Sequence, residues 1–522
     1  MSTASASEAR TVGLNLSTRY LAIAAEMVVG LLVLPFNLAH LGKAAYGLWV
    51  LTTSITAYFS VLDLGYSGAL VKFVAQYRAK SDTRALNEIL STTFYLFALF
   101  GVVTYLVAIV IAVFLNKVLT ITPDQLHVGR VVLLVTSVNV AAGTAFTVFG
   151  AVINGFQRYD INNITGTVSS VLVAIVNVAV LWMGYGLIEL VVATTIVRVL
   201  TYWVYRANAY RVFPALNLSP NNFRRSRLRE VTSFSVFMLL IDWANKLNYS
   251  IDAIVIGIIL GTTAVAIWSV GQRLAETTQR LTNQLNDILF PNIVDHSASS
   301  RTDRLQTLFL VGTRLSLATV VPIGVALMLM GDLLIHAWVG PDFHGSVIVV
   351  QLLALTVMIR VGVATAGTLL KGAGEHKLVA YTNVVTAVVN VALSVALARS
   401  IGLAGVAIGT LVPVSAAAIF VLFPAACRRV ELPLTRAIGD AVWPAVWPAA
   451  AMAAYIAVTR PMIPVSLIPV IANMGVAALV YAATFIGLGI SATERRLYLS
   501  KIFEATSRTR ARVLLPSESG RA

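Results

Sequence analysis

The sequence has little charge and almost no cysteine. Only 12% of its 522 residues are charged, and Cys427 is its single cysteine. A soluble globular domain carries about a quarter charged residues, so this composition excludes an ordinary soluble protein. One cysteine also excludes an intrachain disulfide.

The motifs of common enzyme classes are absent as well. The chain has no Walker phosphate-binding loop, no HExxH pair and no cysteine cluster, and no Ser/His/Asp set can be picked out. His336 and His344 lie near Asp332 and Asp342, but this spacing matches no familiar metal site and favours a solvated loop. We therefore expect neither an enzyme nor a bound cofactor or metal.

What the chain has instead is long apolar runs. Apolar residues make up 58% of it, and fourteen runs reach the roughly 20 residues that a helix needs to cross a bilayer. These runs lie at approximately 15–39, 46–71, 90–115, 128–153, 163–184, 186–207, 232–258, 264–290, 309–335, 346–370, 378–398, 402–424, 440–459 and 465–489. They are too long for β-strands and do not alternate. The sequence therefore predicts an all-α membrane protein of about fourteen transmembrane helices, whose first span is retained rather than cleaved.

The basic residues are distributed unevenly between the two sides of the membrane. With the N-terminus in the cytoplasm, the inward loops hold 26 Lys and Arg and the outward loops hold five. This asymmetry predicts that both termini are cytoplasmic. Most of the net charge of +15 is therefore explained by the orientation of the chain in the membrane, and we expect no nucleic-acid partner.

Two stretches of the sequence are alike. Residues 41–49 read LGKAAYGLW and residues 260–268 read LGTTAVAIW, with Leu, Gly, Ala and Trp at the same spacing. Further pairs follow in the same order: Gly155 with Gly372, and Gly186 with Gly402. The offset stays near 217 residues and corresponds to six spans. Because six is even, both copies enter the membrane in the same direction, which makes the repeat parallel.

The repeat predicts two six-helix lobes that face each other across a pathway, followed by two extra helices. The expected parts are an N-lobe at 1–207, a basic cytoplasmic linker at 208–230, a C-lobe at 231–427, the last two helices at 428–490 and a basic cytoplasmic tail at 491–522.

The eighth run carries a polar stripe. Its polar residues recur every three or four positions and so share one face of a helix; they are Gln272, Arg273, Glu276, Gln279, Arg280, Asn283, Gln284 and Asp287. A charge at the bilayer centre costs at least about 2.5 kcal/mol, so this face cannot contact lipid. Ion pairing, as between Glu276 and Arg280, is the alternative for any single residue. The stripe as a whole favours a hydrated cavity, because a dry bundle would have to desolvate all of these groups together.

Further charges in other runs extend the set of candidate site residues. The substrate-binding candidates are Arg19, Lys246, Arg273, Arg280, Arg314, Arg360, Gln272, Gln279 and Asn283. The ion-coupling candidates are Glu26, Asp63, Asp242, Asp252, Glu276 and Asp287. Arginine stays charged and its planar fork suits phosphate oxygens, so these residues favour a substrate that bears phosphate.

The sequence resembles a known family at this point. The stretch from Tyr46-Gly47-Leu48-Trp49 through Leu62-Asp63-Leu64-Gly65-Tyr66-Ser67-Gly68-Ala69 resembles the second span of polysaccharide-biosynthesis flippases of the O-antigen (Wzx-like) type. The six-plus-six-plus-two arrangement is similar to the multidrug/oligosaccharidyl-lipid/polysaccharide (MOP) exporter superfamily.

This resemblance implies a function. Such proteins move a lipid-linked oligosaccharide, usually linked to undecaprenyl pyrophosphate, from the cytoplasmic to the outer leaflet of the bacterial inner membrane. They use alternating access, commonly coupled to an ion gradient. The implied partners are the lipid-linked glycan and membrane lipids, with a polysaccharide polymerase and glycosyltransferases as further candidates.

Two other functions stay open. A multidrug or cation antiporter of the same superfamily would have the same spans, although the many arginines disfavour it. A non-transporting scaffold of a polysaccharide assembly complex is disfavoured by the charges inside the spans, which lipid-facing packing alone would not require.

Overall fold

The computed structural model describes residues 3–59, 66–119, 122–228, 251–298, 302–490 and Arg495. In these residues the chain is almost entirely helical and has no strand, which confirms the predicted all-α class. The α-helices are α1 (Thr3–Phe59), α2 (Tyr66–Ala79), α3 (Thr83–Val118), α4 (Pro123–Gly155), α5 (Tyr159–Trp182), α6 (Leu187–Val212), α8 (Thr262–Ala298), α9 (Thr302–Val339), α10 (Gly345–Gly362), α11 (Ala364–Gly372), α12 (His376–Ala416), α13 (Phe423–Arg429), α14 (Leu434–Ala437), α15 (Trp443–Val446), α16 (Ala449–Thr459) and α17 (Leu467–Thr484). The described chain also has three short 3-10 helices, η2 (Pro220–Asn222), η3 (Pro341–Phe343) and η6 (Arg460–Met462). It has three π-helical segments, η4 (Ala417–Leu422), η5 (Ile438–Val442) and η7 (Phe485–Gly489).

The helices are long enough for a multi-pass membrane protein. Among the described residues, ten helical segments have the length and apolar composition to cross a bilayer. Two of these segments bend where the sequence predicts a loop: α1 at Gly42, with φ of 74°, and α12 at Gly402, with φ of 63°. Residues 229–250 lie outside the described residues, so the total of fourteen spans stays a prediction.

The described chain groups into two compact units. The first comprises Met1–Thr277, Val339–Leu353 and Lys377–Ala417, and the second comprises Thr278–Trp338, Ala354–His376 and Ala418–Ala522. The boundaries of the predicted lobes, linker and tail are not tested by this grouping and stay predictions.

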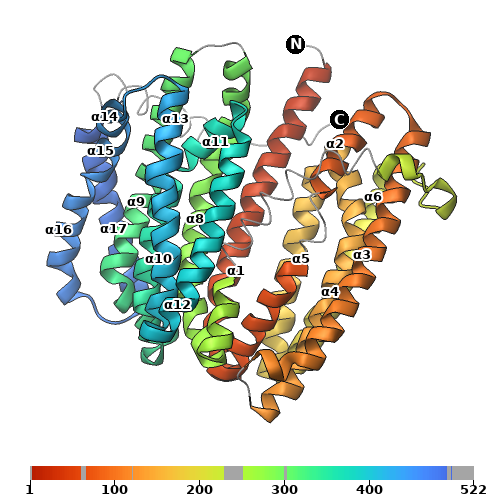
Figure 1. Ribbon diagram of the computed structural model, residues 1–522, viewed down its shortest axis with the longest axis horizontal. Coiled ribbons are helices and arrows are strands. Elements are labelled where there is room, and N and C mark those ends of the chain that lie inside the picture. Colours follow the sequence, from red (N-terminus) through yellow and green to blue (C-terminus); the bar gives the residue numbers. More distant parts are fainter. Residues whose placement is uncertain are drawn as a thin grey trace, which may run out of the picture. The chain divides into compact units, whose positions relative to one another are not determined.

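In the first unit, the core lies among α2, α3, α4 and the end of α6. Helices α3, α4 and α6 run alongside one another (Figure 1), and buried apolar side chains such as Val74, Ile89, Phe97 and Val152 fill the space between helices. Helix α4 starts at a capping box in which the Thr122 hydroxyl accepts from the Gln125 amide, followed by Pro123 in the first turn. Such caps fix where the apolar face of a helix begins.

In the second unit, α9 is the central described helix. Phe309 on α9 packs on Phe423 of α13 with ring centroids 5.5 Å apart. The Ser316 hydroxyl lies 3.4 Å from the Thr365 hydroxyl of α11. Farther along the chain, the buried Tyr481 of α17 donates to the carbonyl of Ala445, which joins the last helices to each other.

The two copies of the sequence repeat meet at equivalent positions within the first unit. A Cβ added at Gly47 would collide with the backbone carbonyl of Thr262 and lie 3.2 Å from the amide nitrogen of Ala266. Ala266 is the residue 219 positions after Gly47, which is the offset of the repeat at this point. A contact between equivalent residues of two copies is expected at a pseudo-two-fold axis.

A second contact recurs in each copy. A Cβ at Gly129 of α4 would lie 3.2 Å from the Leu48 side chain of α1. The corresponding residues of the second copy are Ser346 of α10 and Ile267 of α8, and the Ser346 hydroxyl donates to the Ile267 carbonyl at 2.6 Å. The same helices therefore pack together in both copies, which supports the duplication read from the sequence.

We expect Gly47→Ala to destabilise the protein, because the added methyl group meets backbone atoms that cannot rotate away. Overpacking of this kind costs about 1–3 kcal/mol. Gly367→Ala in α11 is the control, since nothing lies within 4 Å of an added Cβ there. Thermal unfolding in detergent should show a lower midpoint for Gly47→Ala alone, and equal midpoints would contradict the close contact.

Candidate functional site

The structure describes the side chains of ten of the fifteen predicted site residues. Asp63, Asp242 and Lys246 lie outside the described residues. Asn283 and Asp287 lie on α8, but their side chains are outside the description. The predicted roles of these five residues stay predictions.

The ten described side chains fall into the two units. Those of the first unit are Arg19, Glu26, Asp252, Gln272, Arg273 and Glu276, and those of the second are Gln279, Arg280, Arg314 and Arg360. Asp252 and Arg314 are buried, with 4% and 8% of their surface exposed. Arg19, Glu26 and Arg280 are exposed, and the others are half-buried.

Arg273 reaches from α8 to the backbone of α1. A Cβ added at Gly30 would overlap the guanidinium group of Arg273, so the missing side chain at Gly30 provides the space that this group occupies. Gly30 was not predicted from the sequence, because a glycine in an apolar helix carries no polar signal. The contact holds a cationic group half-buried between two helices.

A chain of hydrogen bonds runs along α8 beside Arg273. The Trp268 indole donates to the Gln272 amide oxygen at 2.8 Å, and the Gln272 amide nitrogen donates to the Glu276 carboxylate at 2.8 Å. The four-residue spacing places these side chains on one face of the helix. Gln272 is engaged at both ends, so its role here is to orient Glu276. The buried Tyr46 hydroxyl of α1 lies near Arg273 and Glu276.

A second cluster gathers oxygen atoms around Asp252. The Thr410 hydroxyl lies 3.1 Å from a carboxylate oxygen of Asp252, 3.4 Å from the amide oxygen of Asn390 and 3.2 Å from the carbonyl of Val406. Ser394 donates to the same Asn390 oxygen at 2.9 Å. One hydroxyl proton cannot serve three acceptors at once. The Thr410 proton therefore goes to one of these oxygens at a time, and the cluster gathers carboxylate, amide, hydroxyl and carbonyl oxygens in one buried place.

Uncharged polar side chains form a third group between α4, α5 and α6. Tyr202 donates to the Asn139 amide oxygen at 2.9 Å, and the Ser169 and Thr201 hydroxyls lie 2.8 Å apart. Tyr205 donates to the Asn162 carbonyl at 3.3 Å. The sequence analysis missed this group because it searched for charge. The recurrence of Thr201, Tyr202 and Tyr205 at helical spacing is the signal that could have found it.

One family model matches more than half of the chain. The model of a family described as polysaccharide biosynthesis protein matches residues 40–348. A relative from Haloferax volcanii named "Probable flippase AglR" is 23% identical over 425 residues, which cover 80% of this chain and 83% of the relative.

Solved structures share the fold. The lipid II flippase MurJ in an inward closed conformation has a TM-score of 0.70 at 13% identity, covering 91% of this chain and 98% of that one. An inward-facing multidrug resistance MATE family transporter of the MOP superfamily has a TM-score of 0.62 at 16% identity, covering 80% and 98%. At these identities the likeness concerns the fold, and a fold alone does not choose a substrate.

We expect Gln272→Leu to destabilise the protein, because it leaves the Trp268 indole and the Glu276 carboxylate without the bonds that Gln272 provides. An unsatisfied buried polar group costs about 1–3 kcal/mol. Gln76→Leu on α2 is the control, because the Gln76 side chain is exposed. The thermal midpoint in detergent should fall for Gln272→Leu and not for Gln76→Leu. A fall of the same size in both variants would contradict the proposed role of Gln272.

Proposed function

Because the chain belongs to the family of polysaccharide biosynthesis proteins, we propose that it is a flippase for a lipid-linked oligosaccharide. The family predicted from the sequence is confirmed by the family model. The similarity to a probable flippase and the fold shared with a lipid II flippase and a MOP-superfamily transporter support a transport role. The proposed substrate is a glycan on a polyprenyl carrier such as undecaprenyl pyrophosphate. It moves from the cytoplasmic to the outer leaflet by alternating access.

This proposal depends mainly on the position of Arg273. Its guanidinium group is half-buried, is held against the backbone of α1 at Gly30 and lies on the helix face that also carries Glu276. A planar guanidinium offers paired N–H donors that match phosphate oxygens. Arg273 is therefore the proposed contact to the pyrophosphate of the carrier. Arg19, Arg280, Arg314 and Arg360 stay proposed as further contacts.

The glycan needs a different environment. A sugar carries many hydroxyl groups and cannot cross hydrocarbon without partners for them, since each unpaired hydroxyl costs several kcal/mol. The amide and hydroxyl groups of α4, α5 and α6, among them Asn139, Tyr202 and Ser169, offer donors and acceptors of the required kind. The apolar carrier can stay in the lipid throughout the movement.

Ion coupling is proposed at the Asp252 cluster. Carboxylate, amide, hydroxyl and carbonyl oxygens are the ligands that hard cations prefer. Asp252, Asn390, Thr410 and the carbonyl of Val406 supply all four types within one buried group. A monovalent cation such as Na⁺ or a proton bound there would neutralise the Asp252 carboxylate and bias the packing of α12 against its neighbours.

The proposal includes the setting of the protein. The excess of Lys and Arg in one set of loops supports cytoplasmic termini. The bacterial inner membrane is the location proposed from the family resemblance. Glycosyltransferases would supply the lipid-linked glycan on the cytoplasmic side, and a polymerase would use it on the other side.

We expect Arg273→Ala and Gly30→Leu to impair export of surface polysaccharide. The first removes the guanidinium group and the second fills its place, so each should reduce export by about tenfold or more, the usual effect of losing a hydrogen-bonded charge. Arg273→Lys should retain part of the activity, because it keeps the charge without the fork. Arg399→Ala, an exposed arginine of α12, is the matched control.

The measurement is surface polysaccharide in a strain that lacks this gene and has no second flippase, complemented with each variant at equal protein level. Normal polysaccharide in the uncomplemented strain would contradict the proposed function. Normal export by both Arg273→Ala and Gly30→Leu would contradict the assignment of the site and leave the function in place.

We expect Asp252→Asn to abolish the response of the protein to its coupling ion. The measurement compares thermal midpoints in NaCl and in choline chloride at equal ionic strength and at several pH values. Stabilisation by Na⁺ in the wild type alone indicates a cation site, and a pH dependence present only in the wild type indicates a proton site. Identical salt and pH responses in the wild type and Asp252→Asn would rule out coupling at this cluster.

A further inference from the structure

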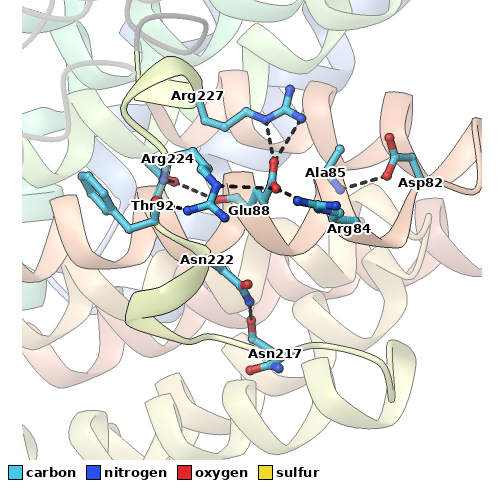
Figure 2. Close-up of polar contacts among 10 residues, drawn as sticks. Asp82, Arg84, Ala85, Glu88, Thr92, Asn217, Asn222, Arg224 and Arg227 are labelled. Atoms are coloured by element: carbon cyan, nitrogen blue, oxygen red, sulfur yellow. Dashed lines mark hydrogen bonds and ion pairs between the residues drawn. The ribbon is translucent and has the colours of Figure 1, made fainter.

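Three arginines converge on one carboxylate at the beginning of α3. Figure 2 shows Glu88 between them. One carboxylate oxygen lies 3.2 Å from Arg84 Nε and 3.7 Å from Arg224 Nε, and the other lies 3.3 Å from Arg227 Nη2. The Glu88 side chain is only 12% exposed, so its negative charge is largely shielded from water.

The cluster carries more positive than negative charge. Other described pairs, such as Arg158 with Asp160 and Arg436 with Asp440, join one cation to one carboxylate. Here one carboxylate contacts three guanidinium groups, so within this group of four side chains the guanidinium groups outnumber the carboxylate. Guanidinium groups held this close repel one another unless further negative charge approaches them. The cluster therefore favours an additional anion.

The arginines differ in what they can still bind. Arg227 is 24% exposed and also donates to the Tyr77 hydroxyl at 2.7 Å, so it belongs to the packing of the protein. Arg84 is 84% exposed and contacts Glu88 through Nε, and Arg224 is 49% exposed. Arg224 Nη1 already donates to the Phe223 carbonyl at 3.3 Å. The outer nitrogens of Arg84 and Nη2 of Arg224 are the donors that a ligand from outside would reach.

The segment that carries Arg224 is held firmly in place. We call residues 213–228 the strap. The Asn87 side chain bonds the Ala215 carbonyl and the Asn217 amide, each at 2.9 Å. Farther along, the Thr92 hydroxyl accepts from the Arg224 amide at 2.9 Å (Figure 2). A fixed backbone lowers the entropy that the arginine loses on binding a ligand.

The cluster lies at the boundary of the membrane. The apolar run of α3 begins at about residue 90, directly after Glu88, and large apolar side chains such as Leu99 and Leu106 are exposed farther along this helix, as expected for contact with lipid. On the strap, Phe223 precedes Arg224 and is 42% exposed. Positive charge next to an exposed aromatic ring at this depth matches the boundary between lipid headgroups and acyl chains.

We propose that Arg84 and Arg224, held together by Glu88, bind the phosphate of an anionic phospholipid on the side of the membrane that the charge distribution assigns to the cytoplasm. The phosphate accepts hydrogen bonds from the two guanidinium groups and offsets the surplus charge, while the acyl chains lie along the apolar part of α3. The lipid ties the strap to the membrane surface. This site does not depend on which substrate the protein transports.

The test is lipid binding by the full-length protein in a neutral detergent. Dioleoylphosphatidylglycerol is titrated against the thermal midpoint, with dioleoylphosphatidylcholine as the uncharged comparison. The wild type should be stabilised by the anionic lipid, and less so at high salt. Arg84→Ala/Arg224→Ala should weaken the apparent affinity by about 25-fold, the product of about fivefold for each arginine near an anionic headgroup.

Arg436→Ala removes one arginine from a one-to-one pair and is the matched control, which should bind as the wild type does. If the double variant is unfolded in the absence of lipid, the single variant Arg84→Ala is tested instead, because the Arg84 side chain is highly exposed. Its affinity for the anionic lipid should fall about fivefold. Equal stabilisation by both lipids, or unchanged affinity of the arginine variants, would overturn the proposal. Stabilisation by inorganic phosphate or by a polyglutamate peptide, but not by phosphatidylglycerol, would also overturn it in favour of a free anion or an acidic protein.

Discussion

The structure depends on the cost of placing polar groups in hydrocarbon. Every backbone N–H and C=O in the bilayer needs a partner within the protein, and helices supply these partners locally. The same cost applies to side chains, so Asp252, Arg314 and Asn390 are buried among other protein groups rather than turned toward lipid. Each buried polar group thus requires its helix to pack against a neighbour in one specific arrangement. The clusters around Arg273 and Asp252 are examples of such packing.

Small residues allow the helices to pack this closely. At Gly47 the two repeat copies approach so closely that no side chain fits between the backbones, and at Gly30 the vacant position holds the guanidinium group of Arg273. The first contact joins equivalent positions of the two copies, whereas the second joins the first copy to an arginine that only the second copy carries. Duplication therefore explains the packing, whereas divergence between the copies explains where charge is concentrated.

The predicted family and the all-α fold are confirmed. The proposed substrate depends on a few side chains. Flippases and multidrug transporters share this fold, so the choice between their substrates depends on individual side chains. The planar guanidinium group of the half-buried Arg273 favours phosphate, and the uncharged polar groups of α4, α5 and α6 favour a hydroxylated substrate. Neither group would be needed by a protein that only serves as a scaffold.

The sequence by itself determined the helices, the family and the polar faces. Apolar length and spacing depend on neighbouring residues along the chain, and for this reason even the bends at Gly42 and Gly402 were predicted as loops. Only the tertiary structure decided which faces meet. It placed Gly30 beneath Arg273, brought Asp252 to Thr410 and fastened the strap to α3. Periodicity reports which side of a helix is polar, but the partner of that side comes from distant parts of the chain, as with Thr410, which lies 158 positions after Asp252.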